Sequence, residues 1–409
     1  MCARATVMER VRKRTQQYSM TRLPRSVILL GLVSLLNDVA SDMIAPLLPI
    51  FLTATLGAGP AIVGLIEGVA ETTSSLVKLW SGRLGDRGVG CKRLAVMGYT
   101  LSNGVRPLLA FAPGWSTVLL LRFSDRIGKG VRTVPRDALI SEAVADSQRG
   151  RAFGVHRAFD HSGAMLGPLL ASVLLACGMP LRDVFLASVI PGVLAVVVLI
   201  LGVRESQQAQ LIAAPPLRWH TLHPRLRGLI VAAGALALAS VPDAFLVLYL
   251  QQSGVSLFWI PLLWALAHGL RALVVMPVSR WSDRGGRLPV LLTGWLTRAA
   301  LLAAMPWFET RAEVIALYLL YSTATALTEG AERALIGDVA DPNSKGTAFG
   351  LYHMTVGMLA LPGALWFGVV WQTVNMHSAF LLAAVMTALA AAWLAFTARH
   401  VTATIRRDT

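Results

Sequence analysis

Twelve apolar runs, separated by short segments of Gly, Pro and charged residues, follow one another along the chain. A helix that crosses a bilayer needs about 20 predominantly apolar residues, and each run reaches that length. The pattern therefore predicts an all-α integral membrane protein with twelve transmembrane helices. The predicted helices occupy residues 26–56, 60–82, 93–113, 115–140, 151–177, 181–203, 226–252, 256–280, 288–307, 312–337, 346–372 and 375–398.

Positive charge is distributed unevenly over the loops between these runs. Seven Lys and Arg residues lie within residues 1–25, and further ones follow the second, sixth and eighth runs. The loops on the opposite side contain only Arg182 and Arg311. Because short cytoplasmic loops carry an excess of Lys and Arg, the sequence predicts a multi-pass protein of the cell (inner) membrane with both termini in the cytoplasm.

An internal repeat divides the chain into two halves. Ala-Leu-Ile-Ser-Glu at 138–142 and Gly-Arg-Ala-Phe-Gly at 150–154 resemble Ala-Leu-Ile-Gly-Asp at 334–338 and Gly-Thr-Ala-Phe-Gly at 346–350, both at an offset of 196 residues. Such repeats are typical of transporters whose substrate site lies between two pseudo-symmetric six-helix halves. We expect a basic cytoplasmic N-terminus (1–25), an N-terminal six-helix bundle (26–203), a central cytoplasmic loop (204–225), a C-terminal six-helix bundle (226–398) and a cytoplasmic tail (399–409).

Composition agrees with a membrane environment and excludes several functions. Only 14% of the 409 residues are charged, against about 25% in soluble domains. The net charge of +15 is spread over short loops, so nucleic acid is not an expected partner. The three cysteines lack the spacing of a metal or disulfide framework, and no phosphate-binding Gly-x4-Gly-Lys-Ser/Thr loop is present. We expect a monomer in the lipid bilayer that binds a small molecule and protons, without a cofactor or a metal.

The fourth apolar run carries a stripe of basic residues. The stripe consists of Arg122, Arg126, Lys129, Arg132 and Arg136. At about 100° per residue these side chains fall within one arc of roughly 120°. A charge at the bilayer centre costs about 2.5–3.5 kcal/mol, so the stripe must face partners or a water-filled cavity. Arg132 and Arg136 lie nearest the cytoplasmic end, where an interfacial position is enough to explain them.

Three segments resemble motifs of the major facilitator superfamily, and the resemblance covers nearly the full chain. They are Gly-Arg-Leu-Gly-Asp-Arg-Gly at 82–88, Leu-Leu-Arg-Phe-Ser-Asp-Arg-Ile-Gly-Lys-Gly at 120–130 and Gly-Ala-Met-Leu-Gly-Pro at 163–168. The resemblance implies a secondary transporter whose first, fourth, seventh and tenth helices line the cavity. With the deep Lys129 of the stripe, the implied substrate and proton pathway comprises Asp38, Asp42, Arg122, Arg126, Lys129, Asp243, Glu329 and Arg333.

The same resemblance assigns two further groups of residues. Asp86 would reach the start of the eleventh helix, and Asp283 would reach the fifth, so that both latch the halves together on the cytoplasmic side. The implied cytoplasmic gate is Gly82, Asp86, Arg87, Asp283 and Arg284. The third segment resembles the exporter and antiporter motif and is Gly163, Gly167 and Pro168. Its glycines, four residues apart, also allow close packing against a neighbouring helix.

The sequence favours a secondary active transporter, with proton-coupled efflux of a small organic molecule as the leading hypothesis. Burial raises a carboxylate pKa and a nearby Arg lowers it, so a carboxylate under both influences can titrate as the cavity opens and closes. Asp38 and Glu329 are the candidates, with His161 and His353 as further relays. Alternatives are uptake or export of an anionic solute or metal chelate bound by the stripe, and ion pairs that only hold helices together. A membrane-embedded enzyme or receptor would leave the two similar halves unexplained.

Overall fold

The computed structural model describes residues 23–86, 89–145, 148–204, 219–340 and 345–405, and every regular element within these ranges is a helix. The first half of the chain forms α2 (Arg25–Asp42), α3 (Leu48–Ile50), η1 (Phe51–Thr55), α4 (Pro60–Asp86), α5 (Cys91–Val105), η2 (Pro107–Phe111), α6 (Trp115–Glu142), α7 (Arg149–Ala176), α8 (Leu181–Ala187) and α9 (Val189–Gly202). The second half forms η4 (Trp219–Thr221), α10 (Pro224–Ala239), α11 (Asp243–Gln252), α12 (Trp259–Gly285), α13 (Arg287–Ala304), η5 (Met305–Trp307), α14 (Arg311–Val339), α15 (Lys345–Thr373) and α16 (Met376–Ile405).

Several predicted runs are divided into two helical pieces, and prolines account for two of the breaks. α10 ends at Ala239 and α11 begins at Asp243, directly after Pro242. The residue before a proline is driven out of the helical conformation, which explains the extended backbone at the break. α8 ends four residues before Pro191, whose ring clashes with the carbonyl one turn earlier in a continuous helix.

Eight helical stretches in the described part of the chain are long and apolar enough to cross a membrane. They are Arg149–Ala176, Leu181–Gly202, Pro224–Gln252, Trp259–Ser282, Arg287–Trp307, Arg311–Val339, Thr347–Thr373 and Met376–Thr397. The first four predicted runs are also helical, but α5 has only 15 residues and α4 and α6 carry many charged side chains. The all-helical, multi-pass architecture is therefore confirmed, whereas twelve crossings remain a prediction.

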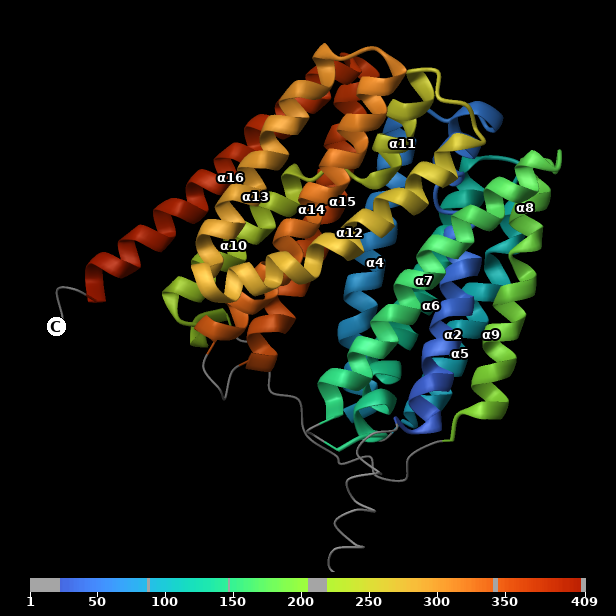
Figure 1. Cartoon of the computed structure of the whole chain (residues 1–409), viewed down its shortest axis with the longest axis horizontal. Helices are drawn as coiled ribbons and strands as arrows, with labels where there is room; N and C mark the ends of the chain where they lie inside the picture. The colour runs from blue at the N-terminus through green and yellow to red at the C-terminus, as the bar shows by residue number, and fades with distance from the viewer. Residues whose placement is uncertain (1–22, 87–88, 146–147, 205–218, 341–344, 406–409) are drawn as a thin grey trace, which may run out of the picture.

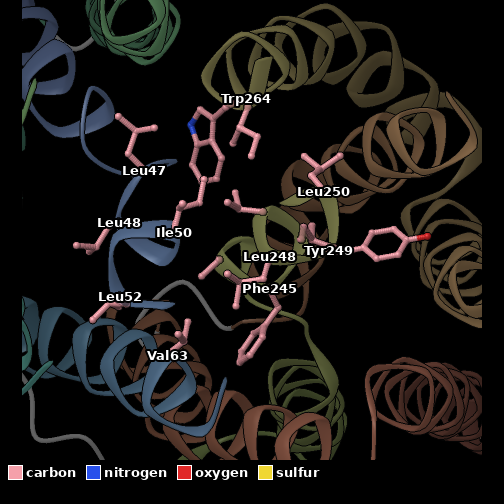
Figure 2. Close-up of a cluster of buried hydrophobic side chains, with 14 of the residues drawn as sticks. Leu47, Leu48, Ile50, Leu52, Val63, Phe245, Leu248, Tyr249, Leu250 and Trp264 are labelled. Atoms are coloured by element: carbon pink, nitrogen blue, oxygen red, sulfur yellow. The ribbon is translucent and has the colours of Figure 1, made fainter. Parts of the chain in front are cut away.

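An apolar cluster joins the helices of the two halves at one end of the molecule. Figure 2 shows Leu47 and Ile50 of the first half beside Trp264 of α12, with Val63 of α4 near Phe245 of α11. All five side chains are at most 8% exposed. In Figure 1 the two sets of helices converge at this end and diverge toward the end where α2 begins and α9 finishes. Hydrophobic contact therefore closes the end of the molecule that lies away from the start of α2.

α4 and α15 form the longest contact between the two halves. A Cβ added to Gly68 would lie 2.8 Å from the Cα of Leu361, and one added to Gly64 would collide with the carbonyl of Ala364. Farther along the same contact, the Thr72 hydroxyl donates a hydrogen bond of 2.6 Å to the carbonyl of Gly357. Small residues let the two backbones approach closely, so this seam depends on glycine at these positions.

Candidate functional site

Asp125 is the centre of a group of buried charges on α6. The Nε of Arg106, from the end of α5, donates to its Oδ1 at 2.9 Å, and both side chains are at most 5% exposed. Arg122 and Arg126 approach the other carboxylate oxygen at 3.8 Å and 3.5 Å. One carboxylate therefore faces three guanidinium groups, so the group carries excess positive charge.

α4 supplies a second carboxylate to this group. The Nη2 of Arg122 donates to Oε1 of Glu67 at 3.0 Å. The Nε atoms of Arg122 and Arg126 are nevertheless buried and lack a hydrogen-bond partner among the residues that the structure describes. Unpaired buried donors are costly, because they forgo the hydrogen bonds that water would supply. Arg126 is therefore the cation of this group with the least complete set of partners.

Asn37 of α2 accepts hydrogen bonds from Arg132 of the stripe and from Arg106. Its Oδ1 accepts hydrogen bonds from Nη1 of Arg132 at 2.6 Å and from Nη1 of Arg106 at 3.1 Å. The Arg132 guanidinium also lies over the ring of Tyr99, 4.6 Å from its centroid. Arg132 is only 5% exposed, because polar side chains of α2 and α5 cover it.

Arg136 is also largely buried within the protein. Its side chain is 16% exposed and pairs with Asp137 at 2.8 Å. Its Nη1 donates to the Ser34 hydroxyl of α2 at 3.3 Å. Hydrogen bonds from α2 therefore reach both Arg132 and Arg136 of the stripe.

The carboxylates predicted on α2 lie beside this group without direct ion pairs within 4 Å among the described residues. Asp38 accepts a hydrogen bond of 2.9 Å from the Asn37 side chain. Asp42 is partly buried and lies within electrostatic range of Lys129 and Arg126. Lys129 likewise faces Glu71 of α4. The structure thus brings Asp42, Arg122, Arg126 and Lys129 of the predicted pathway together.

The predicted pathway residues of the second half are placed differently. Asp243 begins α11 and pairs with Nη2 of Arg271 on α12 at 3.2 Å. Arg333 is exposed on α14 and acts electrostatically on Lys78 of α4, across the space between the halves. Glu329 lies on α14, but its side chain is outside the part that the structure describes. In the described part of the chain, no group of three His, Cys, Asp or Glu side chains is arranged to hold a metal ion.

Most of the predicted gate lies outside the described side chains. Arg87 is not described, and of Asp86 and Asp283 only the helical backbone is. A Cβ added to Gly82 would lie 3.4 Å from Val134 of α6, and Arg284 is exposed near the end of α12. These positions leave the latch a prediction.

The glycines of the third motif lie in the contact between α7 and α2. A Cβ at Gly163 would lie 2.6 Å from the Leu35 carbonyl, and one at Gly167 would lie 2.7 Å from the Val39 carbonyl. Pro168 is buried within the same helix. This geometry accounts for the two glycines by packing alone.

Three arginines inside the helical bundle, two of them buried and one partly buried, were missed by the sequence analysis. Besides Arg106, they are Arg271, which donates to the Ser322 carbonyl at 3.0 Å, and Arg298, which donates to the Ser240 hydroxyl at 3.1 Å. The sequence did contain a signal for these residues, because each is a lone cation inside an apolar run. Such residues in membrane helices mark pairs or pathways.

The helical architecture and the buried intramembrane charges define a polytopic membrane protein of the transporter type. The chain matches the family model "Major Facilitator Superfamily" over residues 30–360 and 269–408. It belongs to this family, whose members are transporters rather than enzymes, and the resemblance inferred from the motifs is confirmed.

Individual relatives agree with this assignment. The "Uncharacterized MFS-type transporter MJ1317" of Methanocaldococcus jannaschii is 29% identical over 381 residues, 91% of this chain and 95% of the relative. The "Multidrug resistance protein MdtH" of Aeromonas hydrophila is 23% identical over 348 residues, 82% of this chain and 84% of that protein. A crystal structure of a bacterial homologue of the human lysosomal transporter Spinster has a TM-score of 0.74 at 16% identity and covers 91% of this chain and 96% of its own.

Proposed function

We propose that this protein is a secondary active transporter that works by alternating access and exports a small organic molecule in exchange for protons. The observation that carries the proposal is the buried group of charges on α2, α4 and α6. It contains cations with incomplete partners, such as Arg126, beside carboxylates without ion pairs, such as Asp42. A purely structural network is expected to satisfy its members, because an unsatisfied one is less stable than an apolar core.

Proton coupling follows from the chemistry of these carboxylates. Binding of a proton changes the charge of a carboxylate, and it shifts a two-state equilibrium only if the states differ in their affinity for it. A carboxylate at the boundary between α2 and the stripe has this property, because opening of the cavity exchanges its buried neighbours for water. Asp38 and Asp42 occupy that boundary, and Asp38 is the residue we assign to coupling.

The proposal includes a topology and a gate. The two bundles, residues 26–203 and 226–398, would each cross the membrane six times, with both termini in the cytoplasm and a monomer as the working unit. Asp86 and Asp283 would latch the bundles on the cytoplasmic side together with Gly82, Arg87 and Arg284. Export is supported by similarity to the multidrug resistance protein, at 23% identity.

A second candidate function is transport of an anionic solute in either direction. The observation that favours it is the excess of cations on α6. Lys129 makes no ion pair within 4 Å among the described side chains, and Asp125 is shared by three arginines. A carboxylate or phosphate group on the substrate would complete these partners.

Transport into proteoliposomes distinguishes these functions. Purified protein is reconstituted in inside-out vesicles and supplied with ethidium, an organic cation, or carboxyfluorescein, an organic anion. Efflux by proton exchange predicts that ethidium accumulates when the lumen is acidic and only equilibrates when a protonophore removes the gradient. Accumulation of carboxyfluorescein alone would support the anionic substrate. Accumulation that ignores the pH gradient would contradict proton coupling.

A further inference from the structure

A second polar group lies in the contact between α2 and α7, apart from the charges around Asp125. Ser34 of α2 hydrogen-bonds Nε2 of His156 at 2.8 Å, and Nδ1 of His156 faces Oδ2 of Asp160 at 3.5 Å. His156 and Asp160 are four residues apart and therefore share one face of α7. The His156 side chain is 2% exposed and that of Asp160 is 18% exposed. Asp160 thus lies at the edge of the contact, and His156 lies inside it.

The hydrogen-bond distances favour one assignment of the proton on the ring nitrogens of His156. Arg136 can only donate, so the Ser34 oxygen accepts from its Nη1 at 3.3 Å. The nearest partner of the Ser34 hydroxyl hydrogen is Nε2 of His156 at 2.8 Å, so we assign this hydrogen to Nε2 and treat the Tyr99 hydroxyl, 3.3 Å away, as a donor to Ser34. Nε2 is therefore an acceptor. The neutral imidazole carries its hydrogen on Nδ1 and directs it at Asp160.

Apart from Ser34 and His156, Asp160 has few donors to stabilise a negative charge. At 3.5 Å the contact from His156 is longer than a strong hydrogen bond. Its other oxygen, Oδ1, is buried and has no hydrogen-bond partner within the described part of the chain. A buried carboxylate oxygen without a donor is costly unless it carries a proton itself.

A neighbouring carboxylate adds to this cost. The Cβ of Asp38 lies against Gly163, one turn beyond Asp160, and the two carboxylates repel each other. The other charged and titratable groups near the pair are Arg136 on α6, Tyr99 on α5, whose hydroxyl lies 3.3 Å from that of Ser34, and Arg157 and His161 on α7.

We propose that Asp160, positioned by His156 and Ser34, is a proton-binding site of this protein. A hydronium ion transfers its proton to Oδ1 of Asp160 and leaves as water, and no other bond forms or breaks. The Asp160–His156 pair then changes from a charge of −1 to neutral, and its repulsion of Asp38 disappears. Because α7 packs on α2 and also on α12, this change acts on a contact within one half and on a contact between the halves.

The inference rests on the proposed proton coupling but can be tested without transport. Infrared difference spectra of the full-length purified protein, recorded between about pH 8 and about pH 5, report carboxylic acids through their C=O stretch. Asp160→Asn should remove a component that corresponds to about one acid per molecule. His161→Asn, on the same helix but exposed, should retain the component. His156→Asn should move the pH at which it appears, which a merely structural Asp160 would not do.

A further variant keeps the test valid if Asp160→Asn fails to fold. Asp160→Glu retains an acid and should show the component at a changed frequency. An unchanged band in both Asp160 variants would overturn the site. If the band behaves as expected while ethidium accumulation ignores the pH gradient, the site stands and the proposed coupling fails.

Discussion

Loss of the Asp125 carboxylate should destabilise the protein far more than loss of Asp137, a more exposed carboxylate on the same helix. Asp125→Asn removes the charged partner that lies 2.9 Å from Arg106, whose side chain is only 5% exposed. The change also weakens the ion pairs of Asp125 with Arg126 at 3.5 Å and with Arg122 at 3.8 Å. Removing one member of a buried ion pair costs about 3–5 kcal/mol. At roughly 2–4 °C per kcal/mol, the apparent Tm should fall by roughly 10 °C.

Asp137→Asn is the matched control, because it breaks another Arg–Asp contact of 2.8 Å on the same helix. Asp137 is 42% exposed, so water replaces it and the expected cost is about 0–1 kcal/mol. The assay is thermal unfolding of purified protein in detergent, followed by tryptophan fluorescence. A double variant with Arg106→Gln should recover part of the loss. Equal Tm values for Asp125→Asn and Asp137→Asn would refute the assignment of Asp125 as the centre of the buried charges.

Three further predictions concern topology, the stripe and the α4–α15 seam. Reporter fusions after Gly88, Ser206 and Asp408 should report the cytoplasm and those at Gly59, Gly114 and Gly254 the opposite side; an opposite-side signal at Ser206 would break the two-half model. Arg126→Ala should abolish transport in proteoliposomes whereas Arg136→Ala should only reduce it, because exposed Asp137 lets water replace Arg136; equal losses would argue against this difference. Gly68→Val should lower transport by about tenfold through a clash with Leu361, while Gly154→Val, which has open space around its Cβ, should leave it unchanged.

The sequence predicted the helices well because apolar runs in a membrane protein leave few alternatives. Each predicted run is helical, and the spacing of the α6 stripe placed Arg122 and Arg126 in one group correctly. The breaks near Ser188 and Pro242 were missed, because apolar composition continues through them.

Partners of the charged side chains could not be predicted, because helix pairing depends on tertiary packing. No sequence spacing relates Glu67 to Arg122, and only the packing of α4 on α6 makes the two residues partners. Arg106 and His156 were overlooked because one important partner of each lies far away in the chain: Asp125 is 19 positions from Arg106, and Ser34 is 122 positions from His156. Side chains outside the described part, such as that of Glu329, keep their predicted roles as hypotheses.

Exchange of protons for an organic substrate is measured most directly as a change of pH in the lumen of the vesicles. Inside-out proteoliposomes with a pH-sensitive dye in an acidic lumen receive ethidium on the outside. If protons leave the lumen in exchange for ethidium, ethidium entry should make the lumen more alkaline, at a fixed ratio of protons to ethidium. Asp38→Asn, which imitates the protonated form, should lose the proton flux while ethidium still equilibrates. Entry of ethidium into wild-type vesicles without a change in lumenal pH, or the same proton flux in Asp38→Asn, would contradict the account.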